Sequence, residues 1–197
     1  AILTKITTTA KDVIVPDSFM VTGDSKYYKV IAIDTPVCNN NSSMESLKIP
    51  EKVKTIGANA FSNCSKLSMV WLPSTLQEIS KNAFSNCRAI TYICSSVKTP
   101  FEIDLSVFSD YSKPTLYVPD GTAKAYKGKG GWEQFQNVVE GYLVDVPTID
   151  DMTYLRIRNG EGSTVSGTAI LTKAATTTPD VIIPDTIKQK TDDISTT

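Results

Sequence analysis

The segment from Leu47 to Ile93 repeats itself with a shift of 23 residues, and this repeat limits the possible folds more than any other feature of the chain. The shift superimposes apolar and small residues throughout: Pro50 on Pro73, Ile56 on Ile79, Ala60-Phe61 on Ala83-Phe84, Asn63-Cys64 on Asn86-Cys87, and Val70 on Ile93. A second shift upstream places Ile33 under Ile56 and Asn40 under Asn63. A fixed period of about 20 to 30 residues predicts a chain of coils, in which neighbouring repeats bury each other's apolar face.

Each repeat carries the pattern LxxVxL, as in Leu67, Val70 and Leu72, and this pattern is typical of a leucine-rich-repeat solenoid. We expect a right-handed superhelix that is mainly β, with short helical or 3₁₀ turns and a cap at both ends. Because side chains alternate along a strand, Met69 and Trp71 should point away from the core. The residues expected inside are Leu67, Val70, Leu72, Leu76, Ile79, Phe84, Ile90 and Ile93, with Phe84 placed by a helical or 3₁₀ turn at residues 82–84.

Three segments depart from the regular repeat. The run Val13-Ile14-Val15-Pro16 predicts a short strand, and Phe19 to Ile33 predicts a hairpin around Gly23-Asp24 that closes the first edge of the solenoid. Residues 97–113 form an irregular coil, whose core we expect to be filled by Phe101, Ile103, Leu105 and Phe108. Residues 116–139 predict a last strand, a short helix and a return, with Trp132 and Phe135 as a lid rather than a ligand site.

The chain is modular. We expect residues 1–141 to be the leucine-rich-repeat solenoid with its hairpin and C-terminal cap, and residues 142–197 to be a linker and the β-strand start of a following, truncated module. Ala-Ile-Leu-Thr-Lys at residues 169–173 repeats residues 1–5, and residues 180–185 match residues 12–17 with one Val/Ile exchange. The copy follows a predicted strand at residues 153–158, for which residues 1–5 have no counterpart in this sequence. The open edge at residues 1–5 therefore predicts self-association through residues 142–197, by fold-back or by exchange with another copy.

Composition excludes several classes of function. A net charge of -1 gives no pull on nucleic acid, and no apolar run is long enough for a membrane span. The chain has no histidine, which argues against hydrolase triads and histidine metal sites, so we expect no enzyme and no cofactor. Cys64 and Cys87 could be nucleophiles or a bridge, but equivalent repeat positions favour buried free thiols. The equivalent asparagines Asn40, Asn63 and Asn86 are expected to satisfy backbone groups.

The outward strand positions form two columns that are unusually apolar for a solvated face. They are Ser46, Met69, Tyr92 and Thr115 in one column, and Lys48, Trp71, Cys94 and Tyr117 in the other. Clustered exposed aromatic residues mark contact surfaces, so the candidate partner-binding residues are Lys48, Met69, Trp71, Tyr92 and Tyr117. Two alternatives remain open: the C-terminal segment or a neighbouring molecule covers this face, or the cluster arises by chance.

The repeat in residues 49–70 (Ile-Pro, Val, Thr-Ile-Gly, Asn-Ala-Phe, Cys, Leu, Val) and its copy in residues 72–93 resemble the BspA-like leucine-rich repeat family of bacterial surface proteins. The residues Leu116 to Pro119 with Tyr126, Trp132 and Phe135 are similar to the element that closes such arrays. The resemblance implies secretion or display on a bacterial cell surface, and adhesion to a protein or host-matrix partner without catalysis. Cys38 and Asn41 depart from the pattern, at the phenylalanine and cysteine positions.

Two other functions remain open beside this one. A carbohydrate-binding module would also use Trp and Tyr, but it needs carboxylates or amides beside the rings, and Glu45 is the only obvious one. A structural spacer in a larger surface array would need no ligand.

Overall fold

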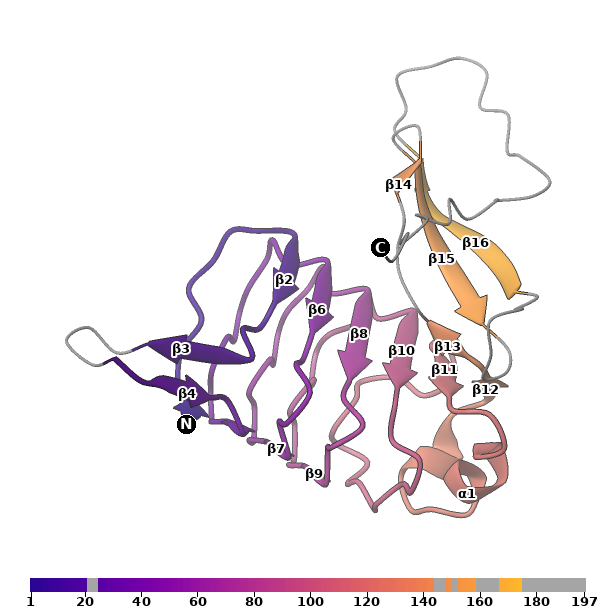
Figure 1. Cartoon of the computed structure of the whole chain (residues 1–197). Helices are drawn as coiled ribbons and strands as arrows, with labels where there is room; N and C mark the ends of the chain where they lie inside the picture. Colours follow the sequence, from indigo (N-terminus) through magenta and orange to yellow (C-terminus); the bar gives the residue numbers. More distant parts are fainter. Residues whose placement is uncertain (21–24, 144–147, 150–151, 159–166, 175–197) are drawn as a thin grey trace, which may run out of the picture.

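The computed structural model describes residues 1–20, 25–143, 148–149, 152–158 and 167–174, and it shows a solenoid of parallel strands with about five turns (Figure 1). Successive turns stack side by side from the indigo N-terminal end to the cap around α1. The predicted solenoid, mainly β with very little helix, is confirmed.

Two parallel sheets form opposite sides of the coils. The larger has the order β12-β11-β10-β8-β6-β2, made of β2 (Asp12–Ile14), β6 (Ser46–Lys48), β8 (Met69–Leu72), β10 (Tyr92–Ser95), β11 (Thr115–Val118) and β12 (Asn137–Glu140). The smaller has the order β1-β5-β7-β9, made of β1 (Ile2–Leu3), β5 (Ala32–Ile33), β7 (Thr55–Ile56) and β9 (Glu78–Ile79). Leu47 pairs with Val70, and Val70 with Ile93, so the strand register follows the sequence repeat.

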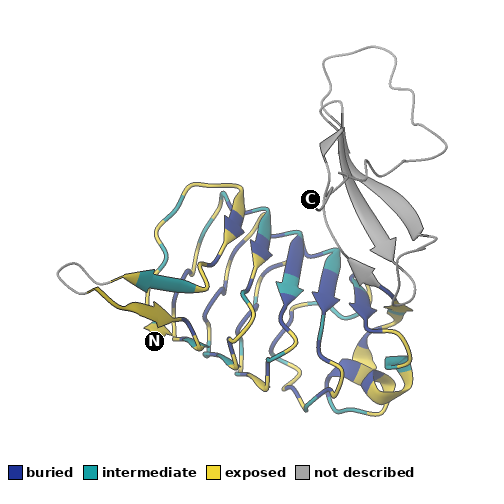
Figure 2. Cartoon of the chain, in the orientation of Figure 1, coloured by how far each residue is buried: buried dark blue, intermediate teal, exposed yellow. Residues whose placement is uncertain are grey.

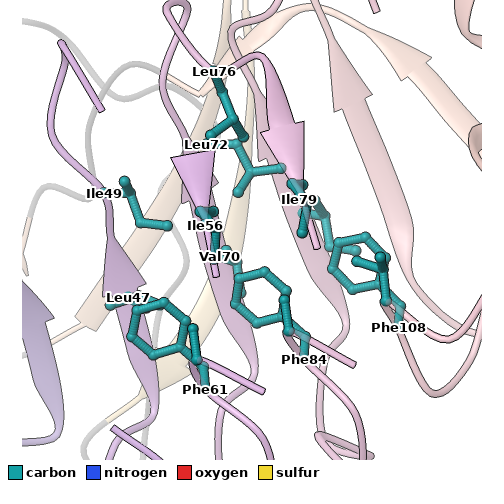
Figure 3. Packing of buried hydrophobic residues seen from close by; sticks show 14 of the residues in the cluster. Leu47, Ile49, Ile56, Phe61, Val70, Leu72, Leu76, Ile79, Phe84 and Phe108 are labelled. Carbon is teal, nitrogen blue, oxygen red and sulfur yellow. The ribbon is translucent and has the colours of Figure 1, made fainter. Parts of the chain in front are cut away.

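The core lies between the two sheets, and the residues predicted to be inside are there. Leu67, Val70, Leu72, Leu76, Ile79, Phe84, Ile90 and Ile93 are all buried in one hydrophobic cluster. Phe61, Phe84 and Phe108 form a column of stacked rings through three turns, with Leu47 and Val70 nearby (Figure 3). Each ring therefore fills space that belongs to two coils.

The corners that lead into the phenylalanine column are turns, and the structure assigns no helical or 3₁₀ segment to residues 82–84. Asn59, Asn63, Asn82 and Asn86 have φ between 55° and 61°, in the left-handed region. A residue in this region interrupts a right-handed helical turn, and asparagine tolerates it better than most residues do. The expected helical turn at these corners is therefore wrong, although Phe84 lies in the core as predicted.

The irregular coil places three of its four expected residues against the core. Ile103 and Phe108 are buried and Phe101 is partly buried against the cluster, but Leu105 is 60% exposed. The bridge between Phe84 and Phe108 spans one residue more than the repeat, and Leu105 lies on the turn that precedes this bridge. Val107, which the sequence analysis did not single out, is buried there instead.

The C-terminal cap closes the last coil with aromatic residues. Helix α1 (Ala123–Lys127) brings in Tyr126, and the 3₁₀ helix η1 (Trp132–Gln134) brings in Trp132. Both side chains and Phe135 are buried, and the Trp132 indole N–H donates to the Phe101 carbonyl at 2.7 Å. The predicted lid is confirmed, and β12 returns to pair with β11.

The hairpin exists, but it does not extend either solenoid sheet. Strands β3 (Ser18–Met20) and β4 (Tyr27–Lys29) pair only with each other, and the turn expected at residues 22–25 lies largely outside the described residues. The edge strands at this end are β1 and β2, so residues 1–14 are themselves the first coil. The hairpin is an insertion between β2 and β5, and Phe19 packs against the core.

A separate antiparallel sheet follows Gly141. It comprises β13 (Tyr142–Leu143), β14 (Thr148–Ile149), β15 (Met152–Arg158) and β16 (Gly167–Ala174), with β15 paired to all three others. The strand expected at residues 153–158 is therefore present. None of these strands pairs with β1, so the fold-back alternative is not found among the described residues. The copy of residues 12–19 lies outside them, and the boundary at residue 141 stays a prediction.

Candidate binding face

Strand pairing aligns the outward residues of the large sheet into two straight columns. One column runs Asp12, Ser46, Met69, Tyr92, Thr115 and Asn137, and the other runs Ile14, Lys48, Trp71, Cys94, Tyr117 and Val139. We call these twelve residues the strand face. All five predicted partner-binding residues belong to it, so the structure brings them together as the repeat predicted.

The strand face is separate from the hydrophobic core. Met69, Cys94 and Tyr117 are buried, yet none of them belongs to the core cluster that contains Val70, Ile93 and Leu116. Trp71 is only half-buried. The alternation of inward and outward positions is therefore confirmed, and the register holds.

The exposure of the strand face differs from the prediction. Lys48 is exposed and Trp71 and Tyr92 are half-buried, but Met69 is only 7% exposed and Tyr117 only 4%. The expectation that all five residues present themselves to solvent is therefore wrong for two of them. Figure 2 shows this burial: the middle strands of the large sheet are coloured as buried or intermediate (blue and teal), whereas β4 of the hairpin is coloured as exposed (yellow).

Neighbouring side chains on the strand face supply part of this cover. Residues in register lie one strand spacing apart, roughly 4.8 Å along each column, so a large side chain on one strand reaches its smaller neighbours on the next. The Tyr92 and Tyr117 rings are 6.2 Å apart at an angle of 38°. Cys94 is small and lies in register between Trp71 and Tyr117, so its larger neighbours overhang it.

Burial changes the acid–base chemistry of this face. Desolvation, with smaller contributions from Tyr92 and Cys94, raises the pKa of the Tyr117 phenol to about 12. Burial also raises the pKa of the Cys94 thiol well above its ordinary value. Both groups are therefore neutral at physiological pH, and neither is an activated nucleophile.

The N-terminal border of the strand face is polar. The Ser46 hydroxyl donates to Asp12 Oδ1 at 2.6 Å, and the Lys11 ammonium lies 3.1 Å from Glu45 Oε1. Glu45 is thus already paired with a cation. Of the five predicted partner-binding residues, Lys48, Trp71 and Tyr92 are accessible to solvent, next to this border.

The other candidate groups have structural roles. All four cysteines are free and buried. The Cys64 thiol donates to the Cys38 carbonyl at 3.2 Å, and the Cys87 thiol donates to the Phe61 carbonyl at 3.1 Å. The hydrogen bond with Cys87, together with burial, raises the pKa of Cys64. Asn86 Nδ2 donates to Asn63 Oδ1 at 2.9 Å, which joins the side chains of two neighbouring coils rather than a side chain and the backbone, as was expected.

Neither metal clusters nor membrane-spanning helices occur in the part of the chain that the structure describes. No group of three or more Cys, Asp or Glu residues there could hold a metal ion. The helices in the same residues are all too short or too polar to cross a bilayer.

A second surface was not predicted from the sequence. Apolar side chains are exposed at the N-terminal end of the stack, beside β1 and on the hairpin: Ile2, Met20, Tyr27 and Ile31. The separation between the first two strands of the large sheet could have indicated the inserted hairpin. Asp12 and Ser46 occupy paired positions but are 34 residues apart, which exceeds the repeat by the length of an inserted hairpin.

The fold and the strand face together define a parallel repeat solenoid with a partly covered aromatic sheet face. Residues 31–122 match the family model described as BspA type leucine rich repeat region, in 6 copies. This part of the chain is a BspA-type leucine-rich repeat region, as the resemblance implied.

Two solved structures are similar to this chain. One is a leucine rich repeat protein of T. pallidum, with 22% identity and a TM-score of 0.49, covering 71% of this chain and 72% of that one. The other is a leucine rich cell surface protein of Faecalibacterium prausnitzii, with 18% identity and a TM-score of 0.35, covering 81% of this chain and 55% of that one. No curated protein matches the chain.

Proposed function

We propose that this chain is a non-catalytic protein-binding module of a secreted or surface-displayed bacterial protein. The partner is a surface or host-matrix protein, and adhesion is the role of the module. The observation that carries the proposal is the half-buried pair Trp71 and Tyr92, which lies outside the core beside the exposed Lys48. The BspA-type repeat supports the surface or secreted location.

The contact area is narrower than the sequence predicted. Because Met69 and Tyr117 are buried, they hold the half-buried rings in place rather than meeting a partner first. A rigid aromatic anchor loses little side-chain entropy on binding, and such anchors carry much of the affinity of protein interfaces. We therefore assign the direct contacts to Trp71, Tyr92 and Lys48.

The experiment is a binding screen of the immobilised full chain against purified host-matrix and bacterial surface proteins, followed by titration of each hit. Trp71→Ala should weaken a specific hit by more than about 1 kcal/mol, the usual threshold for an interface hot spot. Tyr27→Ala is the matched control, because this exposed tyrosine lies on the hairpin and outside the strand face. Equal losses in both variants, or a hit indifferent to Trp71→Ala, would reject the strand face as the binding surface.

A carbohydrate-binding module is the second candidate, because the same two rings could stack on sugars. Its support is weaker, since the Glu45 carboxylate that would hydrogen-bond a sugar is paired with Lys11. A glycan array probed with the wild-type chain and with Trp71→Ala separates the two. A chain that binds nothing in the protein screen and nothing on the glycan array would instead be a structural spacer.

A further inference from the structure

Two cysteines of neighbouring coils lie at the same corner of the solenoid. Cys64 and Cys87 are separated by one repeat, and both side chains are buried. Each thiol points toward the coil before its own, because Cys64 donates to the Cys38 carbonyl at 3.2 Å and Cys87 donates to the Phe61 carbonyl at 3.1 Å. The thiol of Cys87 is therefore directed toward the coil that contains Cys64.

Hydrogen bonds hold the two coils together directly before these cysteines. The Asn63 N–H donates to the Ser85 carbonyl at 2.8 Å, and Asn86 Nδ2 donates to Asn63 Oδ1 at 2.9 Å. Chain segments paired in this way lie roughly 4.8 Å apart. The Cα atoms of a disulfide usually lie about 4.4 to 6.8 Å apart. A bond between Cys64 and Cys87 therefore needs no large movement of the backbone.

The two thiols also interact with each other. The hydrogen bond with Cys64 lowers the pKa of Cys87, against the effect of burial. The hydrogen bond with Cys87, together with burial, raises the pKa of Cys64. Because the thiolate is the nucleophile in disulfide exchange, Cys87 is the attacking thiol of this pair, and Cys64 lies in contact with it as the second thiol.

We propose that Cys64 and Cys87 are a redox-active pair, which a small-molecule disulfide such as oxidised glutathione converts into a disulfide bond between two coils. The Cys87 thiolate attacks one sulfur of the small disulfide and releases the first small thiolate. The Cys64 thiolate then attacks the Cys87 sulfur and releases the second. Two electrons pass from the cysteines to the small disulfide, which leaves as two thiols that carry the two cysteine protons. This reaction is independent of the partner binding proposed for the strand face.

The buried pair lies directly behind the surface of the solenoid. Asn63 and Asn86, which precede the two cysteines, are exposed, and so is Arg88, which follows Cys87. Local opening of a short corner costs less than global unfolding. Opening of this corner therefore gives the small disulfide access to the thiols.

The bond joins the two coils that carry the accessible aromatic residues of the strand face. Cys64 precedes β8, which contains Trp71, and Cys87 precedes β10, which contains Tyr92. A disulfide stabilises a fold mainly by restricting the unfolded chain. The oxidised chain should therefore unfold at a higher denaturant concentration than the reduced chain.

The first test is refolding of the reduced, denatured full chain in mixtures of reduced and oxidised glutathione, in which every thiol is accessible. Cleavage by trypsin after lysine and arginine places each cysteine in a different peptide: Cys38 in 30–48, Cys64 in 55–66, Cys87 in 82–88 and Cys94 in 89–98. Mass spectrometry should show peptides 55–66 and 82–88 linked, with the other two thiols free. Four free thiols at the most oxidising ratio, mixed disulfides with glutathione alone, or a predominant link between Cys38 and Cys64 would overturn the proposal.

The second test adds oxidised glutathione to the folded, reduced chain and assigns the two roles. Wild type should form the same link. Cys64→Ser should stop at the mixed disulfide of Cys87 with glutathione, because the second attack is lost. Cys87→Ser should leave Cys64 as a free thiol. Glutathione on Cys64 in that variant, or no reaction of the wild type, would contradict the assignment of Cys87 as the attacking thiol.

The third test measures the effect of the bond on stability. Chemical denaturation compares the oxidised and the reduced form of each variant, so that any cost of the substitution itself cancels. Wild type and the matched controls Cys38→Ser and Cys94→Ser, which also change buried cysteines, should have a higher midpoint when oxidised. Cys64→Ser should show no such rise. An equal rise in Cys64→Ser, or no rise in wild type, would show that no bond between these coils is formed.

Discussion

The ring of Phe84 lies almost parallel to that of Phe61, with centroids 5.5 Å apart and an interplanar angle of 12°. On its other side Phe108 lies 5.3 Å away at 6°. The three rings come from three successive coils, and both Phe61 and Phe84 are fully buried. The column therefore connects the regular repeats with the irregular coil that supports the C-terminal cap.

Phe84→Ala should destabilise the chain by roughly 3 to 5 kcal/mol, because it opens a cavity that neither neighbouring ring can fill. Each coil contacts only its neighbours, so the coils of both Phe61 and Phe108 should lose protection from hydrogen exchange. Chemical denaturation measures the free-energy change. Leu105→Ala, at an exposed position of the irregular coil, is the control with little expected effect. An unchanged denaturation midpoint for Phe84→Ala would show that the column does not support the fold.

Gly131→Ala should destabilise the C-terminal cap more than Gly121→Ala does. Both glycines have positive φ, 82° and 75°, so alanine is strained at either position. A Cβ on Gly131 would also overlap the Ile103 carbonyl oxygen, whereas a Cβ on Gly121 meets nothing within 4 Å. The difference between the free energies of unfolding of the two variants, measured by chemical denaturation, reports the steric contact with Ile103. Equal effects would mean that backbone strain alone matters there.

Asn86→Ala should cost more stability than Asn86→Gly. The residue has φ of 60°, and a left-handed conformation costs most L-residues about 1 to 2 kcal/mol, which glycine avoids. Both variants lose the amide hydrogen bond to Asn63, so their difference reports the backbone conformation alone. Thermal denaturation of the two variants side by side measures it. A glycine variant less stable than the alanine variant would contradict this explanation.

The sequence predicted the core better than the surface, and the reason is physical. Inward residues such as Val70 and Phe84 repeat with the coil, because each must fill an equivalent space between the sheets. Lys48, Trp71 and Tyr117 were correctly placed in one outward column by the same periodicity. Their exposure, however, depends on the size of the neighbours in the column, and the strand pattern does not encode it.

The other differences have local causes. Leu105 lies on an exposed turn, in line with Asn82 of the preceding repeat, which is not buried either, although its apolar character predicted burial. The hairpin interrupts the repeat between β2 and β5, so the sequence predicts the strand near residue 14 but not that residues 1–14 form a coil of the solenoid. The helical turn predicted at residues 82–84 is absent, because the positive φ of Asn82 is a backbone property that the repeat does not specify.

The last prediction is a loss of stability at high pH. Burial raises the pKa of Tyr126 to about 12, and it raises that of Tyr117 to about 12 as well, from an ordinary value of 10.0. Between these values the unfolded chain releases the two protons and the folded chain retains them. Since the unfolded state then binds fewer protons, the free energy of unfolding falls as pH rises. The stabilisation is complete below pH 10 and is lost as pH rises through 12.

Denaturation midpoints measured across this range, with tyrosinate absorbance recorded in parallel, test the effect. Tyr117→Phe and Tyr126→Phe should each reduce the slope of stability against pH, whereas Tyr27→Phe, at an exposed position, should leave it unchanged. Tyr126→Phe should also lower stability at neutral pH, because the phenol is hydrogen-bonded with Ser95 Oγ at 2.6 Å and donates to the Val97 carbonyl at 2.9 Å. Losing these bonds removes the phenol donor from the buried Val97 carbonyl, at a cost of about 1 to 3 kcal/mol. A slope that is the same in all three variants would mean that neither buried phenol controls the alkaline transition.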